Sequence, residues 1–101
     1  MSKPREIDID GVAALGDRSV EAARIWVTEG VGSTVLIDPG VLEDPRVFGY
    51  LIADTIRHAA KAYAAVWPVN ENKALQAIVD GVGQELREQF NTITPIEGRS
   101  H

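Results

Sequence analysis

Two long stretches of the chain carry an apolar residue at every third or fourth position, and one proline, Pro68, separates them. This spacing places the apolar side chains along one side of an α-helix. Proline cannot continue a helix, because it lacks the backbone N–H and its ring meets the preceding turn. We therefore predict a helix from about Pro45 to just before Pro68, and a second one capped by Asn70 and running to about Thr92.

Each predicted helix has its own apolar stripe. In the first helix the stripe comprises Phe48, Ile52, Ile56, Ala59, Tyr63 and Val66. In the second it comprises Leu75, Ile78, Val79, Val82, Leu86, Phe90 and Ile93. Gly81 and Gly83 interrupt this second helix, and a glycine there costs about 1 kcal/mol relative to alanine. We predict a continuous helix nevertheless, because the stripe keeps its phase across the glycines.

A β-hairpin is predicted before the helices. β-Branched and aromatic residues dominate from Val20 to Thr28 and again from Thr34 to Asp38, which is typical of strands. Between them, Glu29 to Ser33 contains the glycines that tight turns use. After the second strand, Asp38-Pro39 and Asp44-Pro45 each pair a capping aspartate with a proline, which predicts a short turn over about 39–43.

The two faces of this hairpin differ in character. Alternation places Ala23, Ile25 and Val27 on one face with Val35 and Ile37, and we expect that face to meet the helices. The opposite face carries Arg24, Trp26 and Thr28 on the first strand and Leu36 on the second. An isolated two-stranded ribbon is marginal in water, so we predict that Trp26 is covered. Either the Ile7/Ile9 segment or a second copy of the chain could cover it.

The length of 101 residues suits one domain. We predict an α+β fold in which a β-hairpin is followed by two long antiparallel helices, all within residues 19–93. Residues 1–18 form a weakly ordered segment or a short strand at Ile7 and Ile9, and residues 94–101, which begin with Thr94-Pro95, form a tail.

Composition excludes several classes of function. The chain has 10 Lys and Arg residues against 15 Asp and Glu residues, with no dense basic stretch, so nucleic acid is not an expected partner. It has no cysteine, which removes disulfides, thiolate metal sites and thiol nucleophiles. The charged start resembles no signal peptide, and no run of about 18 apolar residues occurs. We expect a cytoplasmic protein that does not enter a membrane.

The most suggestive polar group is Asp54, Arg57 and His58 on the first predicted helix. Residues three and four positions apart on a helix can touch, and a carboxylate that orients an imidazole is half of a proton-transfer device. The group could bind a ligand, or it could be an ordinary surface ion pair. The only other histidine, His101, lies in the predicted tail, so we predict no metal site, and no motif predicts a cofactor.

Several segments resemble a family of short bacterial proteins that carries a domain-of-unknown-function label. The resemblance rests on Arg24-Ile25-Trp26-Val27, on the run from Glu43 to Asp54, and on Arg57-His58 and Ala62-Tyr63. It extends from about Val20 to Phe90 and implies no activity.

These patterns support two main hypotheses about function. The first is a non-enzymatic homodimer that serves as an interaction or structural module, with Trp26, Leu36, Val47 and Leu51 at the interface. The alternative is a protein or enzyme that binds a small anionic ligand in a cleft through Asp54, Arg57 and His58. A third possibility, an adaptor that receives a partner protein's helix or strand, shares the features of the first.

Overall fold

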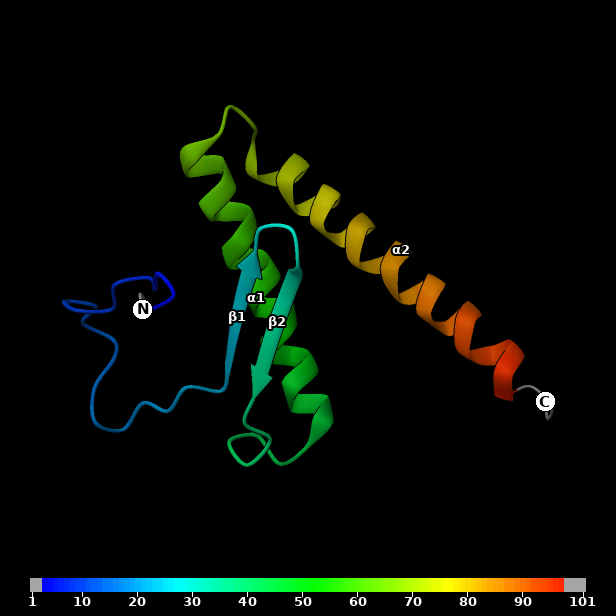
Figure 1. Cartoon of the computed structure of the whole chain (residues 1–101). Coiled ribbons are helices and arrows are strands. Elements are labelled where there is room, and N and C mark those ends of the chain that lie inside the picture. The colour runs from blue at the N-terminus through cyan, green and yellow to red at the C-terminus, as the bar shows by residue number, and fades with distance from the viewer. Residues whose placement is uncertain (1–2, 98–101) are drawn as a thin grey trace. The chain divides into compact units, whose positions relative to one another are not determined.

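The computed structural model describes the backbone of residues 3–97 and the side chains of residues 3–89. The chain divides into two compact units, Met1–Asp44 and Pro45–His101. The first unit contains two strands and the second contains two helices, in the order β1, β2, α1, α2 (Figure 1). The predicted α+β class, a hairpin followed by two helices, is therefore confirmed. The predicted domain boundaries stay a prediction.

The hairpin consists of β1 (Ala23–Thr28) and β2 (Gly32–Ile37), which pair antiparallel from Ala23 opposite Ile37 to Thr28 opposite Gly32. Its loop is shorter than predicted, because Gly32 already belongs to β2. The Thr28 carbonyl accepts a hydrogen bond of 3.0 Å from the Val31 N–H. Gly30 has a φ of 78°, which the third position of a type II turn requires and which glycine adopts without steric cost.

The segment before β1 contains no strand between residues 3 and 22, and β1 begins at Ala23 and not at Val20. Of the two alternatives for this segment, the short strand at Ile7 and Ile9 is therefore wrong, and local turns follow Ile9. The N–H of Val12 donates to the Ile9 carbonyl at 3.2 Å, and two similar bonds follow toward Ser19. Each of these bonds joins residues three positions apart. The apolar alternation at Ile7 and Ile9 is too brief to form a strand.

Helix α1 (Pro45–Val66) and helix α2 (Glu71–Glu97) form the second unit. The Asn70 side chain accepts a hydrogen bond of 2.8 Å from the Lys73 N–H, which confirms Asn70 as the N-cap of α2. Helix α2 is continuous through both glycines, as predicted. The predicted end at Thr92 is wrong, since α2 continues through Pro95 to Glu97. Near a helix end, proline removes a hydrogen bond only from the last turn.

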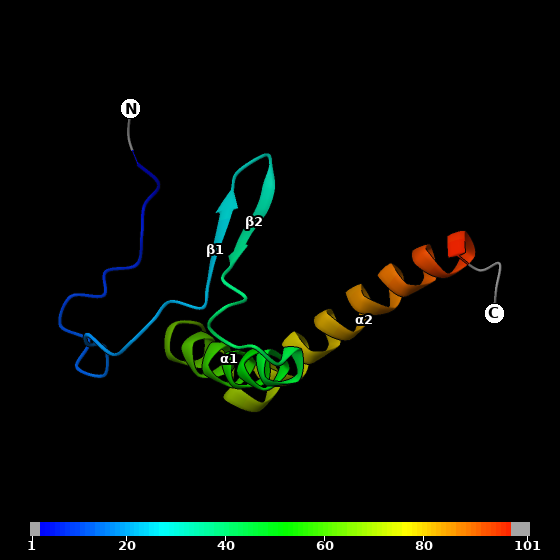
Figure 2. The same ribbon diagram turned by 90° about the horizontal axis from the view of Figure 1, so that it is seen from below.

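The two helices contact each other close to the turn that joins them and diverge from there (Figures 1 and 2). Ala60 and Ala74 are the buried hydrophobic residues among the described side chains, with 1% and 6% exposure. Beside them, the Lys61 ammonium lies 3.1 Å from the Glu71 carboxylate and links α1 to α2. Small side chains thus let the helix backbones approach each other where the unit is best packed.

The covered row on α1 differs from the predicted stripe in its second half. Every fourth residue is buried or half-buried, in the row Phe48, Ile52, Ile56, Ala60 and Ala64. Tyr63 and Val66, which were predicted to face the core, are exposed. A row of spacing four drifts around the helix and suits packing between helices that cross at an angle. Phe90 and Ile93 of the α2 stripe lie outside the described side chains.

Candidate functional site

The polar group predicted on α1 does assemble. The Asp54 carboxylate lies 3.4 Å from the Arg57 guanidinium and 3.7 Å from the His58 imidazole. Helix geometry alone brings them together, because residues at i+3 and i+4 share a face. These distances are long for hydrogen bonds, and all three side chains are more than half exposed, at 56%, 62% and 67%. Water therefore competes with every contact in the group.

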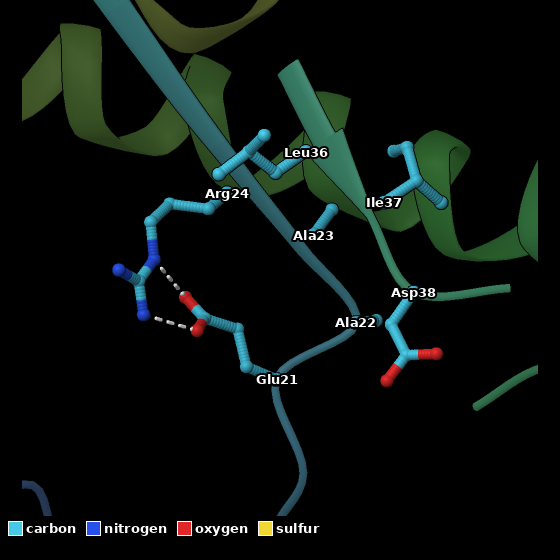
Figure 3. Close-up of a pocket in the computed structure, with 7 residues that line it drawn as sticks. All are labelled: Glu21, Ala22, Ala23, Arg24, Leu36, Ile37 and Asp38. Atoms are coloured by element: carbon cyan, nitrogen blue, oxygen red, sulfur yellow. Dashed lines mark hydrogen bonds and ion pairs between the residues drawn. The ribbon is translucent and has the colours of Figure 1, made fainter. Parts of the chain in front are cut away.

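A second polar group, not predicted from the sequence, is centred on Arg24 of β1. Its guanidinium donates two hydrogen bonds to the Glu21 carboxylate, one of 2.9 Å from Nε and a shorter one from Nη2 (Figure 3). Glu6 of the N-terminal segment lies 3.6 Å from the same guanidinium. The guanidinium carbon also lies 5.9 Å from the centre of the Trp26 ring, within the range of a cation–π contact.

The hydrogen bonds between Arg24 and Glu21 shift the pKa of both side chains. Hydrogen bonding by Arg24 stabilises the ionised carboxylate and lowers the pKa of Glu21 below its ordinary value of 4.5. The same bond raises the pKa of Arg24, which stays protonated at any physiological pH. Both side chains are about half exposed, at 45% and 54%, so the pair positions Arg24 beside Trp26 without contributing much to stability.

Two hollows lie on the hairpin unit. The smaller, of about 340 Å³, is at the open end of the hairpin and is lined by Glu21 to Arg24 and by Leu36 to Asp38 (Figure 3). The larger is a groove of about 790 Å³ between the N-terminal segment and β1. Its walls include Ile7, Ile9, Leu15 and Val20 from the segment, and the residues of β1 from Ala23 to Val27. Neither hollow is lined by Asp54, Arg57 or His58.

The residues predicted at an interface lie in both units. Trp26 is half-buried against Arg24 and the groove, and Leu36 on β2 is exposed. In the helical unit, Val47 and Leu51 on α1 are also exposed. All four are therefore at the surface of the chain, where a partner could reach them.

The described residues offer no assembled metal centre, since no three His, Cys, Asp or Glu side chains between residues 3 and 89 converge. His101 lies outside this range. Neither α1 nor the described part of α2 is long and apolar enough to cross a membrane.

Sequence reasoning missed the Arg24 group for a definite reason. A strand beginning at Val20 would place Glu21 and Arg24 on opposite faces. Because β1 starts at Ala23, the chain at Glu21 is free to bend, and the carboxylate reaches the guanidinium. The signal available in the sequence was the pairing of opposite charges three residues apart beside a tryptophan.

The chain shares 30% sequence identity with a protein of the photosynthetic bacterium Rhodopseudomonas palustrus CGA009, whose solved structure is named as a proposed pyruvate dehydrogenase. The match covers 85% of this chain and 86% of that one, with a TM-score of 0.64. No curated protein matches. Residues 11–90 match the family described as "Domain of unknown function (DUF5076)", and the chain belongs to that family.

Proposed function

We propose that this protein is a non-enzymatic homodimer that serves as an interaction or structural module. The observation that carries the proposal is the exposed apolar face of the hairpin. Ile25, Val27, Val35 and Ile37 share this face and are 45 to 83% exposed. Soluble monomers rarely leave such a contiguous set of large aliphatic side chains in water.

The free energy available from covering this face is large relative to the stability of a hairpin. Full burial of one such side chain contributes about 1.5–3 kcal/mol, so covering the exposed part of four gives about 4–7 kcal/mol. A two-stranded ribbon alone is marginal in water. Burial against a second copy would therefore supply the stability that the hairpin lacks.

The helical unit adds further apolar surface to this argument. Val47 and Leu51 on α1 are exposed, and so are Val79, Val82 and Leu86 along the inner stripe of α2. In the described part of the unit, only Ala60 and Ala74 are buried. Both units thus present surfaces suited to a partner, and a homodimer would use the same surfaces twice.

Sedimentation at micromolar concentration tests the proposal directly. We expect a mass of twice the 11.0 kDa of one chain. Val27→Ser should shift the protein toward monomer, because it removes the most exposed side chain of the hairpin's apolar face. Val66→Ser is the matched control, since Val66 is similarly exposed but lies at the end of α1, and it should leave the dimer intact. A wild-type protein that sediments only as a monomer contradicts the proposal.

A second candidate function is the binding of a small anion at Asp54, Arg57 and His58. The relative's name mentions pyruvate, which is a carboxylate, and Arg57 offers a planar fork of donors that fits such a group. A thermal-shift titration with pyruvate tests this candidate in wild type and in His58→Ala. An identical response of the two proteins, or no response in either, contradicts it.

A further inference from the structure

Strand β1 has one unpaired edge. The Asp38 N–H donates to the Ala22 carbonyl at 3.0 Å, so the backbone groups of Ala22 point toward β2. Successive residues of a strand point their N–H and C=O groups to opposite sides. Ala23, Ile25 and Val27 therefore direct their backbone groups away from β2.

The outward-pointing residues of this edge include no charged residue and no proline. Natural edge strands are blunted by charged side chains, proline or a bulge. The residues that present the edge are an alanine, an isoleucine and a valine, and β1 pairs with β2 without a bulge. Arg24 is the only charged residue of β1, and its backbone N–H and C=O groups point toward β2.

A groove runs along the same edge. The hollow of about 790 Å³ is lined by β1 from Ala23 to Val27 on one side and by the N-terminal segment on the other. No backbone hydrogen bond joins that segment to β1 within residues 3–97. Ile7, which lines the groove, is 91% exposed, so the segment does not fill the space.

We propose that this groove receives β1 of a second copy of the chain, so that the two hairpins form one four-stranded antiparallel sheet around a two-fold axis at Ile25. This inference rests on the proposed homodimer and specifies its geometry. In this register Ile25 pairs with the partner's Ile25, and Ala23 pairs with the partner's Val27. All three outward-pointing residues then exchange backbone hydrogen bonds, which no shifted register achieves.

The position of Arg24 and the apolar face of the hairpin both favour a second copy of the chain as the occupant of the groove. Arg24, the only charged residue of β1, falls opposite the partner's Trp26, so no like charges meet. Arg24 already lies against a tryptophan ring within its own chain, at 5.9 Å, and pairing would offer it a second one. The apolar face of each hairpin also becomes continuous with that of its partner, since Ile25 and Val27 remain on one side of the joined sheet.

Thiol cross-linking tests this register, because the chain contains no cysteine. In the proposed sheet, the two copies of residue 25 lie about 5.5 Å apart. The two copies of residue 35, on the same face but on the outer strands, lie roughly 14 Å apart. Ile25→Cys should therefore cross-link with a reagent that spans under about 10 Å, and the matched control Val35→Cys should react at least about tenfold more slowly.

A proline substitution tests the edge without changing the apolar face. Ala23→Pro removes an outward N–H at the first residue of β1, where proline is compatible with a strand. It should raise the dimer Kd by about 10- to 100-fold, because two hydrogen bonds are lost per dimer. Ser33→Pro makes the same change on the outer edge of β2 and should leave the Kd within about threefold of wild type.

The results of these experiments distinguish a failure of the edge pairing from a failure of the proposed homodimer. A wild-type monomer refutes both. A wild-type dimer refutes the edge pairing alone if Val35→Cys cross-links as fast as Ile25→Cys, or if Ser33→Pro weakens it more than Ala23→Pro. Rapid cross-linking of Ile25→Cys supports the edge pairing even where Ala23→Pro fails to fold.

Discussion

The two units of this chain satisfy their backbones in different ways. Helices α1 and α2 make their hydrogen bonds internally, Asn70 caps the second helix, and two buried alanines bring the helices together. In the hairpin, by contrast, half of each strand's backbone groups point away from the other strand, and the apolar face is exposed. A helical hairpin can therefore satisfy its backbone hydrogen bonds locally, whereas a two-stranded sheet leaves half of them for a neighbour.

The chain contains a convenient probe for each unit. Of its two tryptophans, Trp26 lies in β1 and Trp67 lies at the end of α1. Fluorescence of Trp67→Phe reports on the hairpin unit, and fluorescence of Trp26→Phe reports on the helical unit. Substitutions made in these two backgrounds show whether the units unfold independently.

The largest expected effect is in the helical unit. Ala60→Asp places a carboxylate at a position that is 1% exposed and should destabilise this unit by about 3 kcal/mol in urea unfolding. Ala62→Asp is the control, since Ala62 is exposed on the same helix and the change costs only about 0.5 kcal/mol in helix propensity. Equal losses in the two variants would show that the contact between the helices at Ala60 is not structurally important.

The next effect concerns the hairpin turn. Gly30→Ala introduces a side chain at a φ of 78°. It should lower the free energy of unfolding of the hairpin unit, followed by Trp26 fluorescence, by about 1–2 kcal/mol. Gly16→Ala serves as the control, because Gly16 has no left-handed backbone conformation and a Cβ there meets nothing within 4 Å. If the two substitutions behave alike, the turn does not limit the stability of the hairpin.

A smaller effect is expected at the N-cap of α2. Asn70→Ala removes the acceptor of the 2.8 Å bond from the Lys73 N–H and should cost about 1 kcal/mol in thermal unfolding followed by Trp67. Asn72→Ala, inside the first turn of the same helix, should be neutral or slightly stabilising. If Trp26 fluorescence shows the same loss of stability in the hairpin unit, the two units unfold together.

The smallest expected effect is a pH dependence confined to the hairpin. Because Arg24 lowers the pKa of folded Glu21, the pair contributes its stability above pH 4.5, the ordinary value for glutamate. That contribution declines as the pH falls below 4.5 and is absent once folded Glu21 is protonated. Glu21→Gln should remove this dependence from the Trp26 signal. If the acid response survives in Glu21→Gln, another carboxylate is responsible.

Much of the fold could be predicted because its determinants are local. The stop at Pro68, the cap at Asn70 and the glycine at the turn each act within a few residues, and each lies where the sequence placed it. The candidate site on α1 follows the same rule, since helix spacing alone brings Asp54, Arg57 and His58 together. Spacing could not reveal that the three side chains remain in solvent.

The sequence by itself determined which segments become strands and helices, since periodicity, caps and glycines act through the backbone next to them. Only the tertiary structure decided that the covered row on α1 continues through Ala60 and Ala64. It also decided that Glu21 reaches Arg24 and that an open groove follows β1. These features depend on the crossing of two helices and the path of a loop, which are set by contacts between residues distant in the sequence and not by local preference.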